Sequence, residues 1–239
     1  GVNMTKTTKT ISSCVFALVV AAAIVCVGQF SSPSSMLRTV LQMGAVYALI
    51  AVSMNLLNGF TRLFSLGQAG FMTLGAYAYA IFTIPVDARD GVYYLTGVAD
   101  WLKNFSLPIP VALILAGLVG ALCAYLVGIP VLRLKGDYFA IATLGFAEIV
   151  RIVMASTPLN RVTNGSMGLT KIPGFKSYYG IFIVAAICIA LMVLMLNSTY
   201  GRSFKAIRDD EIAAEAMGIN LAHHKQLAFV ISSFIASIG

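Results

Sequence analysis

Long runs of apolar residues, separated by short polar connections, fill most of this sequence of 239 residues. An α-helix needs about 20 mostly apolar residues to cross the hydrocarbon core of a bilayer. Six runs meet this requirement, and a seventh begins near Gln226. The six runs cover approximately Ile11–Phe30, Leu37–Leu57, Leu66–Pro85, Ile109–Leu132, Tyr138–Ala155 and Gly180–Asn197. The pattern predicts an all-α, polytopic membrane protein with six complete spans and the start of a seventh, in a single domain over residues 1–239.

The amino-acid composition also places the chain in a membrane. Hydrophobic residues make up 59% of the sequence and charged residues 10%, against roughly 45–50% and 25% in soluble domains. So much apolar surface exceeds what one water-soluble core can bury, and lipid must therefore solvate part of it. The net charge of +7 comes without the basic stripe and interleaved aromatic residues of nucleic-acid-binding proteins, so we expect no nucleic-acid partner.

The two ends of the sequence raise separate questions. Lys6 and Lys9 precede the first apolar run, as in a signal peptide, but a run of about 20 residues exceeds the roughly 7–15 of a secretory signal and favours a retained helix. The last run, from Gln226, holds about 14 residues and is too short to cross a bilayer. Either its last segment is incomplete or the chain is truncated, and we expect the latter.

Lysine and arginine are unevenly shared between the two sets of connections. With the N-terminus inside the cell, nine of them fall on the cytoplasmic side and six on the outer side. Cytoplasmic connections of membrane proteins carry the excess of these residues, so the sequence predicts a cytoplasmic N-terminus and a cytoplasmic segment at 201–225. The inner set is Lys6, Lys9, Arg62, Arg133, Lys135, Arg202, Lys205, Arg208 and Lys225, and the outer set is Arg38, Arg89, Lys103, Arg161, Lys171 and Lys176.

Glycines interrupt the connection between the second and third runs. Asn58 and Gly59 form a turn signal, and Gly67 and Gly70 recur in the helical pattern that follows. Two interpretations remain open. The glycines form a packed face of a tight hairpin, because small residues let helices approach closely in lipid. Alternatively, the helix is broken and its backbone groups line a transport pathway.

Two charged residues fall inside the fifth apolar run. Glu148 and Arg151 are three residues apart, so on a helix they share one face and lie close enough to pair. A charge near mid-bilayer is costly and needs a partner, and it must face protein or water. One interpretation is a structural pair that locks this helix against its neighbours. The other is a polar element on a transport path or at a conformational switch, direct substrate contact included.

The sequence contains no catalytic constellation. The GxxxxGK[ST], HExxH and GxSxG patterns do not occur in it. The four cysteines lie inside apolar runs without CxxC spacing, so we expect neither a metal site nor an enzyme activity.

The stretch from Gly201 to Lys225 is the most polar part of the chain and predicts a short helix. Asp209 or Asp210 is a good N-cap, and Glu211 adds negative charge to the first turn. Alanines follow, and a glycine can end the helix in the left-handed conformation. The predicted helix is held between two apolar runs, its sides are small, and it would fit a socket on a partner protein. An ordinary solvated loop helix is the alternative.

Four stretches carry a resemblance to a known family. They are LNGFTRLFSLGQAGFMTLGAY, GDYFAIATLGFAEIVRI, TNGSMGL and GRSFKAIRDDEIAAEAMGINLAHHKQLAFVISSF, in this order. Together they resemble the permease subunits of branched-chain amino-acid ABC importers, over most of the chain from about residue 45. The resemblance implies a permease domain in the plasma or inner membrane. It also implies a second permease subunit, an extracytoplasmic binding protein, an amino-acid substrate, and two cytoplasmic ATPases that hold ATP and Mg²⁺, with no cofactor on this chain.

The resemblance further implies a role for the charged segment as the coupling helix that sits in a groove of an ATPase. The residues concerned are Asp209, Asp210, Glu211, Ala213, Ala214, Glu215, Ala216 and Gly218. Three alternatives remain. One is a permease of the related urea and short-chain amide importers. The others are a stand-alone secondary transporter or channel, and a membrane scaffold without a transport role.

Overall fold

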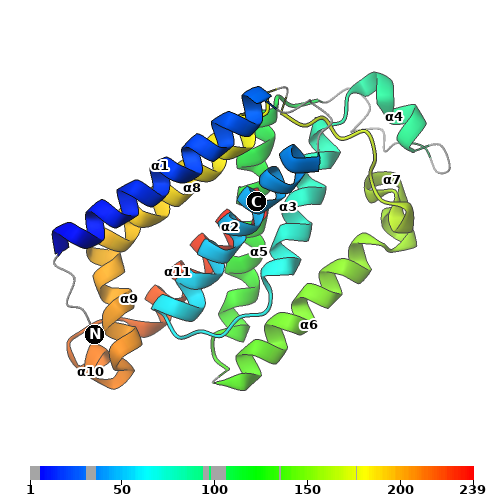
Figure 1. The fold of residues 1–239 in the computed structure, drawn as a ribbon. Helices are drawn as coiled ribbons and strands as arrows, with labels where there is room; N and C mark the ends of the chain where they lie inside the picture. Colours follow the sequence, from blue (N-terminus) through cyan, green and yellow to red (C-terminus); the bar gives the residue numbers. More distant parts are fainter. Residues whose placement is uncertain (1–5, 31–35, 94–96, 98–105, 135, 176) are drawn as a thin grey trace.

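The computed structural model describes residues 6–239 except 31–35, 94–96, 98–105, 135 and 176, and in these residues its regular structure is helical, without a strand (Figure 1). The predicted all-α class is therefore confirmed. Seven helices are long: α1 (Lys6–Phe30), α2 (Met36–Phe60), α3 (Gln68–Thr83), α5 (Ile109–Val131), α6 (Asp137–Met154), α8 (Gly180–Asn197) and α11 (Leu221–Ile238). The short ones are α4 (Val86–Val92), α7 (Asn160–Thr163), α9 (Thr199–Asp209), α10 (Glu211–Ala216) and two 3₁₀ turns, η1 (Thr157–Leu159) and η2 (Gly165–Met167).

Three described helices, α2, α5 and α8, are long and apolar enough to cross a membrane. A fourth span results if α6 and the segment Thr157–Thr163, bent by 56° against each other, are counted as one. The prediction of six complete spans and the start of a seventh is therefore not confirmed. The third predicted span fails because residues 61–67 are not helical and α3 has only 16 residues. In α11, the first turns are polar.

Helix α11 lies at the centre of the packing. It contacts α5, α3 and α2, and it runs through the middle of the bundle in Figure 1. Glycines permit the closest approaches. A Cβ on Gly75 of α3 would lie 1.9 Å from the backbone oxygen of Ser237, and one on Gly120 of α5 would lie 1.8 Å from its Oγ. The sequence indicated only the beginning of an apolar run here.

Buried polar side chains connect α11 to its neighbours. Gln68 Nε2 donates to Ser232 Oγ at 2.8 Å, and Ser232 Oγ in turn donates to the backbone oxygen of Ser53 at 2.6 Å. Ser237 Oγ donates to the backbone oxygen of Phe71 at 2.9 Å. Interhelical hydrogen bonds of this kind contribute roughly 0.6–2 kcal/mol each in a membrane. They fix the register of α2, α3 and α11.

An aromatic cluster brings α6 into the same core. The ring of Phe229 on α11 lies 5.5 Å from that of Phe71 on α3 and 6.0 Å from that of Phe139 on α6, both in edge-on geometry. Such pairs add about 0.5–1.5 kcal/mol to the burial of the rings. The start of α6 is therefore held against α3 and α11.

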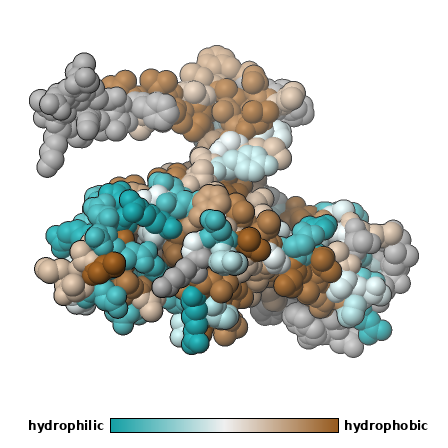
Figure 2. Space-filling view, turned by 90° about the horizontal axis from the view of Figure 1, so that it is seen from below, coloured by the Kyte–Doolittle hydropathy of each residue, from teal (hydrophilic) through white to brown (hydrophobic). Residues whose placement is uncertain are grey.

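The connections at one end of the bundle are rich in charge, and we call this the charged end. It comprises α9, α10, the segments 61–67 and 132–134, and Gly136. Figure 2 looks onto this end, and hydrophilic side chains gather over α9 and α10 in the left part of the view. Helices α4 and α7 lie at the opposite end (Figure 1). Of the charges used for the predicted orientation, Lys103, Lys135 and Lys176 lie outside the described residues.

We predict that Gly70→Ala destabilises the fold. Its Cβ would lie 2.7 Å from the Cα of Ala147, so α3 and α6 would have to separate. Overpacking of this kind costs about 1–3 kcal/mol, and the melting temperature in detergent should fall. Gly44→Ala on α2 is the control, because no atom lies within 4 Å of the place that its Cβ would take. Equal melting temperatures for the two variants would contradict the close α3–α6 contact.

Candidate functional site

The chain bends sharply where α8 ends and α9 begins. Ser198 is extended, and a Cβ on Gly201 would lie 2.1 Å from the backbone oxygen of Leu196, so the bend requires glycine at that position. Helix α9 then lies across the charged end, with Phe204 and Ile207 fully buried. It contacts α8, α2 and α11. These contacts give the following segment a rigid base.

Helix α10 is capped at both ends, as the sequence predicted. Asp210 is the N-cap, and its carboxylate accepts hydrogen bonds from the backbone N–H groups of Ile212 at 2.8 Å and Ala213 at 3.1 Å. Asp209, the other candidate, instead pairs with Arg208 at 3.0 Å.

The C-terminal end of α10 is a Schellman motif. Gly218 has a φ of 86°, and its N–H donates to the backbone oxygen of Glu215 at 2.9 Å. The N–H of Ile219 donates to the backbone oxygen of Ala214 at 3.1 Å. A helix of six residues is too short to be stable alone in water, so these caps help to preserve it.

Helix α10 packs against its own chain through one buried residue, and its other residues are exposed. Ala214 is buried. Lys225 on α11 makes a 2.8 Å ion pair with Glu211 and so ties the two helices together. Ile212 and Met217 are 81% and 84% exposed. The remaining predicted coupling residues are also exposed, namely Asp209, Asp210, Ala213, Glu215, Ala216 and Gly218.

The two exposed apolar side chains were not predicted as part of the site, because the prediction rested on the alanines and the charged residues. Its signal was present, since Ile212 and Met217 are the large apolar residues that flank the alanines in the most charged stretch of the chain. Contiguous exposed apolar patches with a polar rim mark protein-binding surfaces, and these two side chains are the large apolar ones that α10 and its C-cap expose.

A hollow of about 660 Å³ separates α10 from the bundle. It is lined from three parts of the chain that are distant in sequence. Its charged lining residues are Arg62, Arg133, Asp137, Glu211, Glu215 and Lys225. Arg62 adopts the left-handed conformation, with a φ of 51°, which is uncommon for a side chain of this size. No sequence pattern groups these residues, because only the fold brings them together.

The connection between α2 and α3 packs tightly although it is not helical. Asn58 Oδ1 accepts from the N–H of Ser65 at 3.1 Å, and the N–H of Leu66 donates to Thr143 Oγ1 at 3.1 Å. A Cβ on Gly67 would lie 3.1 Å from the backbone oxygen of Thr143. With Gly70, it therefore forms a small-residue face against α6. In α2, a Cβ on Gly59 would lie 2.2 Å from Oδ1 of Asn55, one turn earlier in the same helix. A role of this connection in a pathway stays a hypothesis.

Glu148 and Arg151 pair with each other on α6. Arg151 Nε donates to Glu148 Oε2 at 3.1 Å, and Arg151 Nη2 contacts the other carboxylate oxygen. The side chains are 53% and 70% exposed, respectively. The predicted pairing is therefore present, and the pair points away from the rest of the chain.

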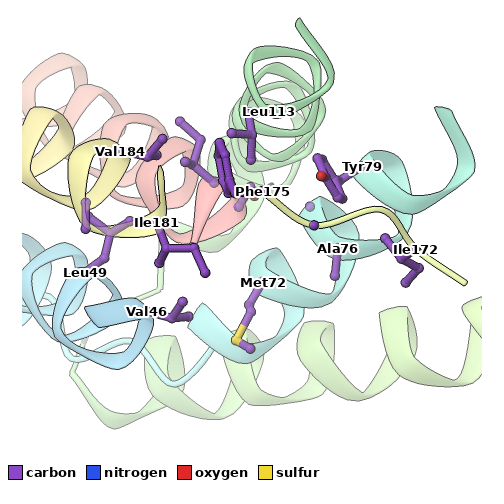
Figure 3. Close-up of a pocket in the computed structure, with 16 residues that line it drawn as sticks. Val46, Leu49, Met72, Ala76, Tyr79, Leu113, Ile172, Phe175, Ile181 and Val184 are labelled. Carbon is purple, nitrogen blue, oxygen red and sulfur yellow. The ribbon is translucent and has the colours of Figure 1, made fainter. Parts of the chain in front are cut away.

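An apolar cavity of about 300 Å³ opens between α2, α3, α5, α8, α11 and the segment 172–175 (Figure 3). Leu49, Met72 and Phe175 contribute to its walls, and the Tyr79 hydroxyl beside them donates to the backbone oxygen of Pro173 at 2.7 Å. Residues 237–239 also line it. A cavity of this kind accommodates an aliphatic group, from a ligand or from a neighbouring chain segment alike.

Comparison with known proteins gives a family match. Residues 36–239 match the family described as branched-chain amino acid transport system / permease component. The chain is 31% identical to the high-affinity branched-chain amino acid transport system permease protein LivM of Salmonella typhimurium over 82% of its length, and 31% identical to LivM of Escherichia coli over 81%. It covers 49% of each, and so spans about half the length of these relatives.

A more distant relative has another substrate in its name. The fructose import permease protein FrcC of Rhizobium meliloti is 26% identical over 87% of this chain, which covers 62% of that protein. No solved structure matches the chain.

We predict that Asp210→Ala loosens α10 while Asp209→Ala does not. The first change removes both N-cap hydrogen bonds, and loss of a cap costs about 0.5–2 kcal/mol. Amide hydrogen exchange over residues 211–217 should therefore accelerate by about 2- to 30-fold. The second change removes only an exposed ion pair with Arg208, which is worth about 0–1 kcal/mol. Equal exchange in both variants would contradict the capping role.

Proposed function

Because the chain belongs to the family of branched-chain amino acid transport permeases, we propose that it is a membrane-spanning permease subunit of an ATP-driven importer of branched-chain amino acids. The proposal depends on the geometry of α10, a doubly capped helix between α9 and α11, with Ile212 and Met217 exposed. This is the geometry of an element that docks on a partner. ATP hydrolysis would then take place on a separate subunit.

The proposed assembly contains this permease, a second permease subunit, two cytoplasmic ATPases with ATP and Mg²⁺, and an extracytoplasmic binding protein. The charged end is the cytoplasmic one, and the N-terminus is cytoplasmic as well. The described charges support this orientation, since Arg62, Arg133 and Lys225 line one hollow at that end and positive residues collect on the cytoplasmic side of membrane proteins.

Motion of the ATPases would reach the membrane through two connections. One runs from α10 through α9, whose Phe204 is buried in the main core. The other is the ion pair of Glu211 with Lys225, which leads into α11. Because α11 contacts α2, α3 and α5, a displacement of α10 would be passed to the centre of the bundle. The two halves of the importer would then alternate between outward and inward access.

The hollow between α10 and the bundle, which Ile212 also lines, gives this displacement room. Its walls carry both signs of charge, with Arg62 and Arg133 on the bundle and Glu211 and Glu215 on α10. Approach of α10 to the bundle would therefore bring opposite charges together. In this proposal the α2–α3 connection, which carries Arg62, forms the fixed wall of the hollow.

Transport by the complete importer tests the proposed function. The permease, its partner permease and the ATPases are reconstituted in proteoliposomes with the binding protein outside, and uptake of labelled leucine, isoleucine and valine is measured. Uptake should require ATP inside and should be absent with urea or fructose. Uptake that needs no ATPase and follows an ion gradient would contradict the proposal in favour of a secondary transporter. Uptake of urea or fructose alone would contradict the assigned substrate.

We predict that Ile212→Asp weakens ATPase binding while the permease stays folded. The side chain is 81% exposed, so the change should not disturb the core. Burial of an isoleucine against a partner is worth about 1.5–3 kcal/mol, and its loss should weaken the association about 10- to 150-fold.

Co-purification of the ATPase and ATP-dependent leucine uptake measure the effect. Ile212→Leu is the matched control and should retain both activities, because it keeps the apolar surface. Normal uptake by Ile212→Asp would show that α10 does not dock through this side.

A further inference from the structure

The outward face of α6 combines a charged pair with an apolar surface. Ile141, Leu144, Gly145, Glu148 and Ile152 recur at helical spacing on this face and are exposed, with Arg151 beside them. The opposite face, which includes Phe139, Thr143 and Val150, is buried, and α6 contacts α3 and α5. The described chain therefore leaves this face uncovered.

Glu148 lies well inside the helix, and Arg151 lies in its last turn. Glu148 is about 17 Å from the start of α6, which is about 27 Å long at 1.5 Å per residue. If α6 and the bent segment Thr157–Thr163 form the fourth span, a charge at the depth of Glu148 is costly against lipid and faces protein or a water-filled pathway. Lipid is therefore the least favourable neighbour of this face.

The pair retains unused hydrogen-bonding capacity. The two bonds between Arg151 and Glu148 occupy only part of the guanidinium donors and carboxylate acceptors. The exposed remainder offers an acceptor for a cation directly beside a donor for an anion. Next to it, no atom lies within 4 Å of the position of a Cβ on Gly145, so a small molecule has free access to the carboxylate.

A branched-chain amino acid has the matching chemistry, with an ammonium, a carboxylate and an aliphatic side chain close together. Resting on the proposed function, we propose that the outward face of α6 lines the translocation pathway. Glu148 binds the ammonium group and Arg151 the carboxylate, while Leu144 and Ile152 contact the aliphatic side chain. The substrate thus exchanges its bonds to water for bonds to the pair, without leaving a charge unpaired in the membrane.

Cysteine accessibility in the complete importer tests this site. Cys14, Cys26, Cys123 and Cys188 are first replaced, and the cysteine-free permease must import leucine. Ile152→Cys is then exposed to a charged, water-soluble methanethiosulfonate reagent, with and without saturating leucine. Leu122→Cys is the matched control, because Leu122 is a similarly exposed side chain on α5, a helix whose sequence contains no charged residue.

We expect the reagent to label Ile152→Cys but not Leu122→Cys, and leucine to slow the labelling at least threefold. Leucinamide, which lacks the carboxylate, should protect less. Adding Arg151→Gln to Ile152→Cys should abolish protection by leucine while labelling continues.

Three outcomes would overturn the inference. Absence of labelling would place the face against lipid, and disulfide formation with the second permease subunit would place it in a subunit interface. Labelling that leucine does not slow would show a water-filled surface without a substrate site. If the cysteine-free permease imports leucine and protection fails, only this inference is wrong. If an active importer carries no branched-chain amino acid at all, the proposed function is wrong.

Discussion

The close approach of α11 to α3 and α5 is the contact on which the rest of the structure depends. It is possible because Gly75 and Gly120 have no side chain where Ser237 passes. Lipid tails provide no hydrophobic force between helices, so tight van der Waals contact and buried hydrogen bonds must hold them. The bonds among Gln68, Ser232 and Ser53 do this in the same region. With α11 fixed in the centre, α2, α3, α5 and the start of α6 acquire their places around it.

The same arrangement connects α10, at the charged end, to the centre of the bundle. Helix α10 has little stability of its own, and it is held by its caps, by buried Ala214 and by the ion pair of Glu211 with Lys225. The ion pair leads to the bundle through α11, and the chain before α10 continues from α9, which contacts the bundle. A helix that is capped and attached in this way moves as a unit when it is displaced, because its ends do not fray. The proposed coupling to an ATPase needs this property.

Local features of the chain were predictable from sequence. The span proposed for Ile109–Leu132 is α5, and the one proposed for Gly180–Asn197 has the bounds of α8. An N-cap at Asp209 or Asp210 was also foreseen, because capping depends on neighbours within one helical turn, and the structure places it at Asp210. The number of spans was not predictable from sequence. Hydropathy windows cannot detect that residues 61–67 are not helical and that the N–H of Leu66 bonds to Thr143 on α6. That contact joins segments far apart in the sequence.

The sequence by itself determined that the chain is helical, that it belongs in a membrane, that α10 is capped and that Glu148 pairs with Arg151. All of these follow from composition or from spacings of a few residues, where the covalent chain sets the distances. Tertiary structure alone decided that Ala214 is buried while Ile212 is exposed, and that the charged pair on α6 faces away from the bundle. The rotation of a helix about its own axis is set by its contacts with distant segments, and no local spacing contains that information.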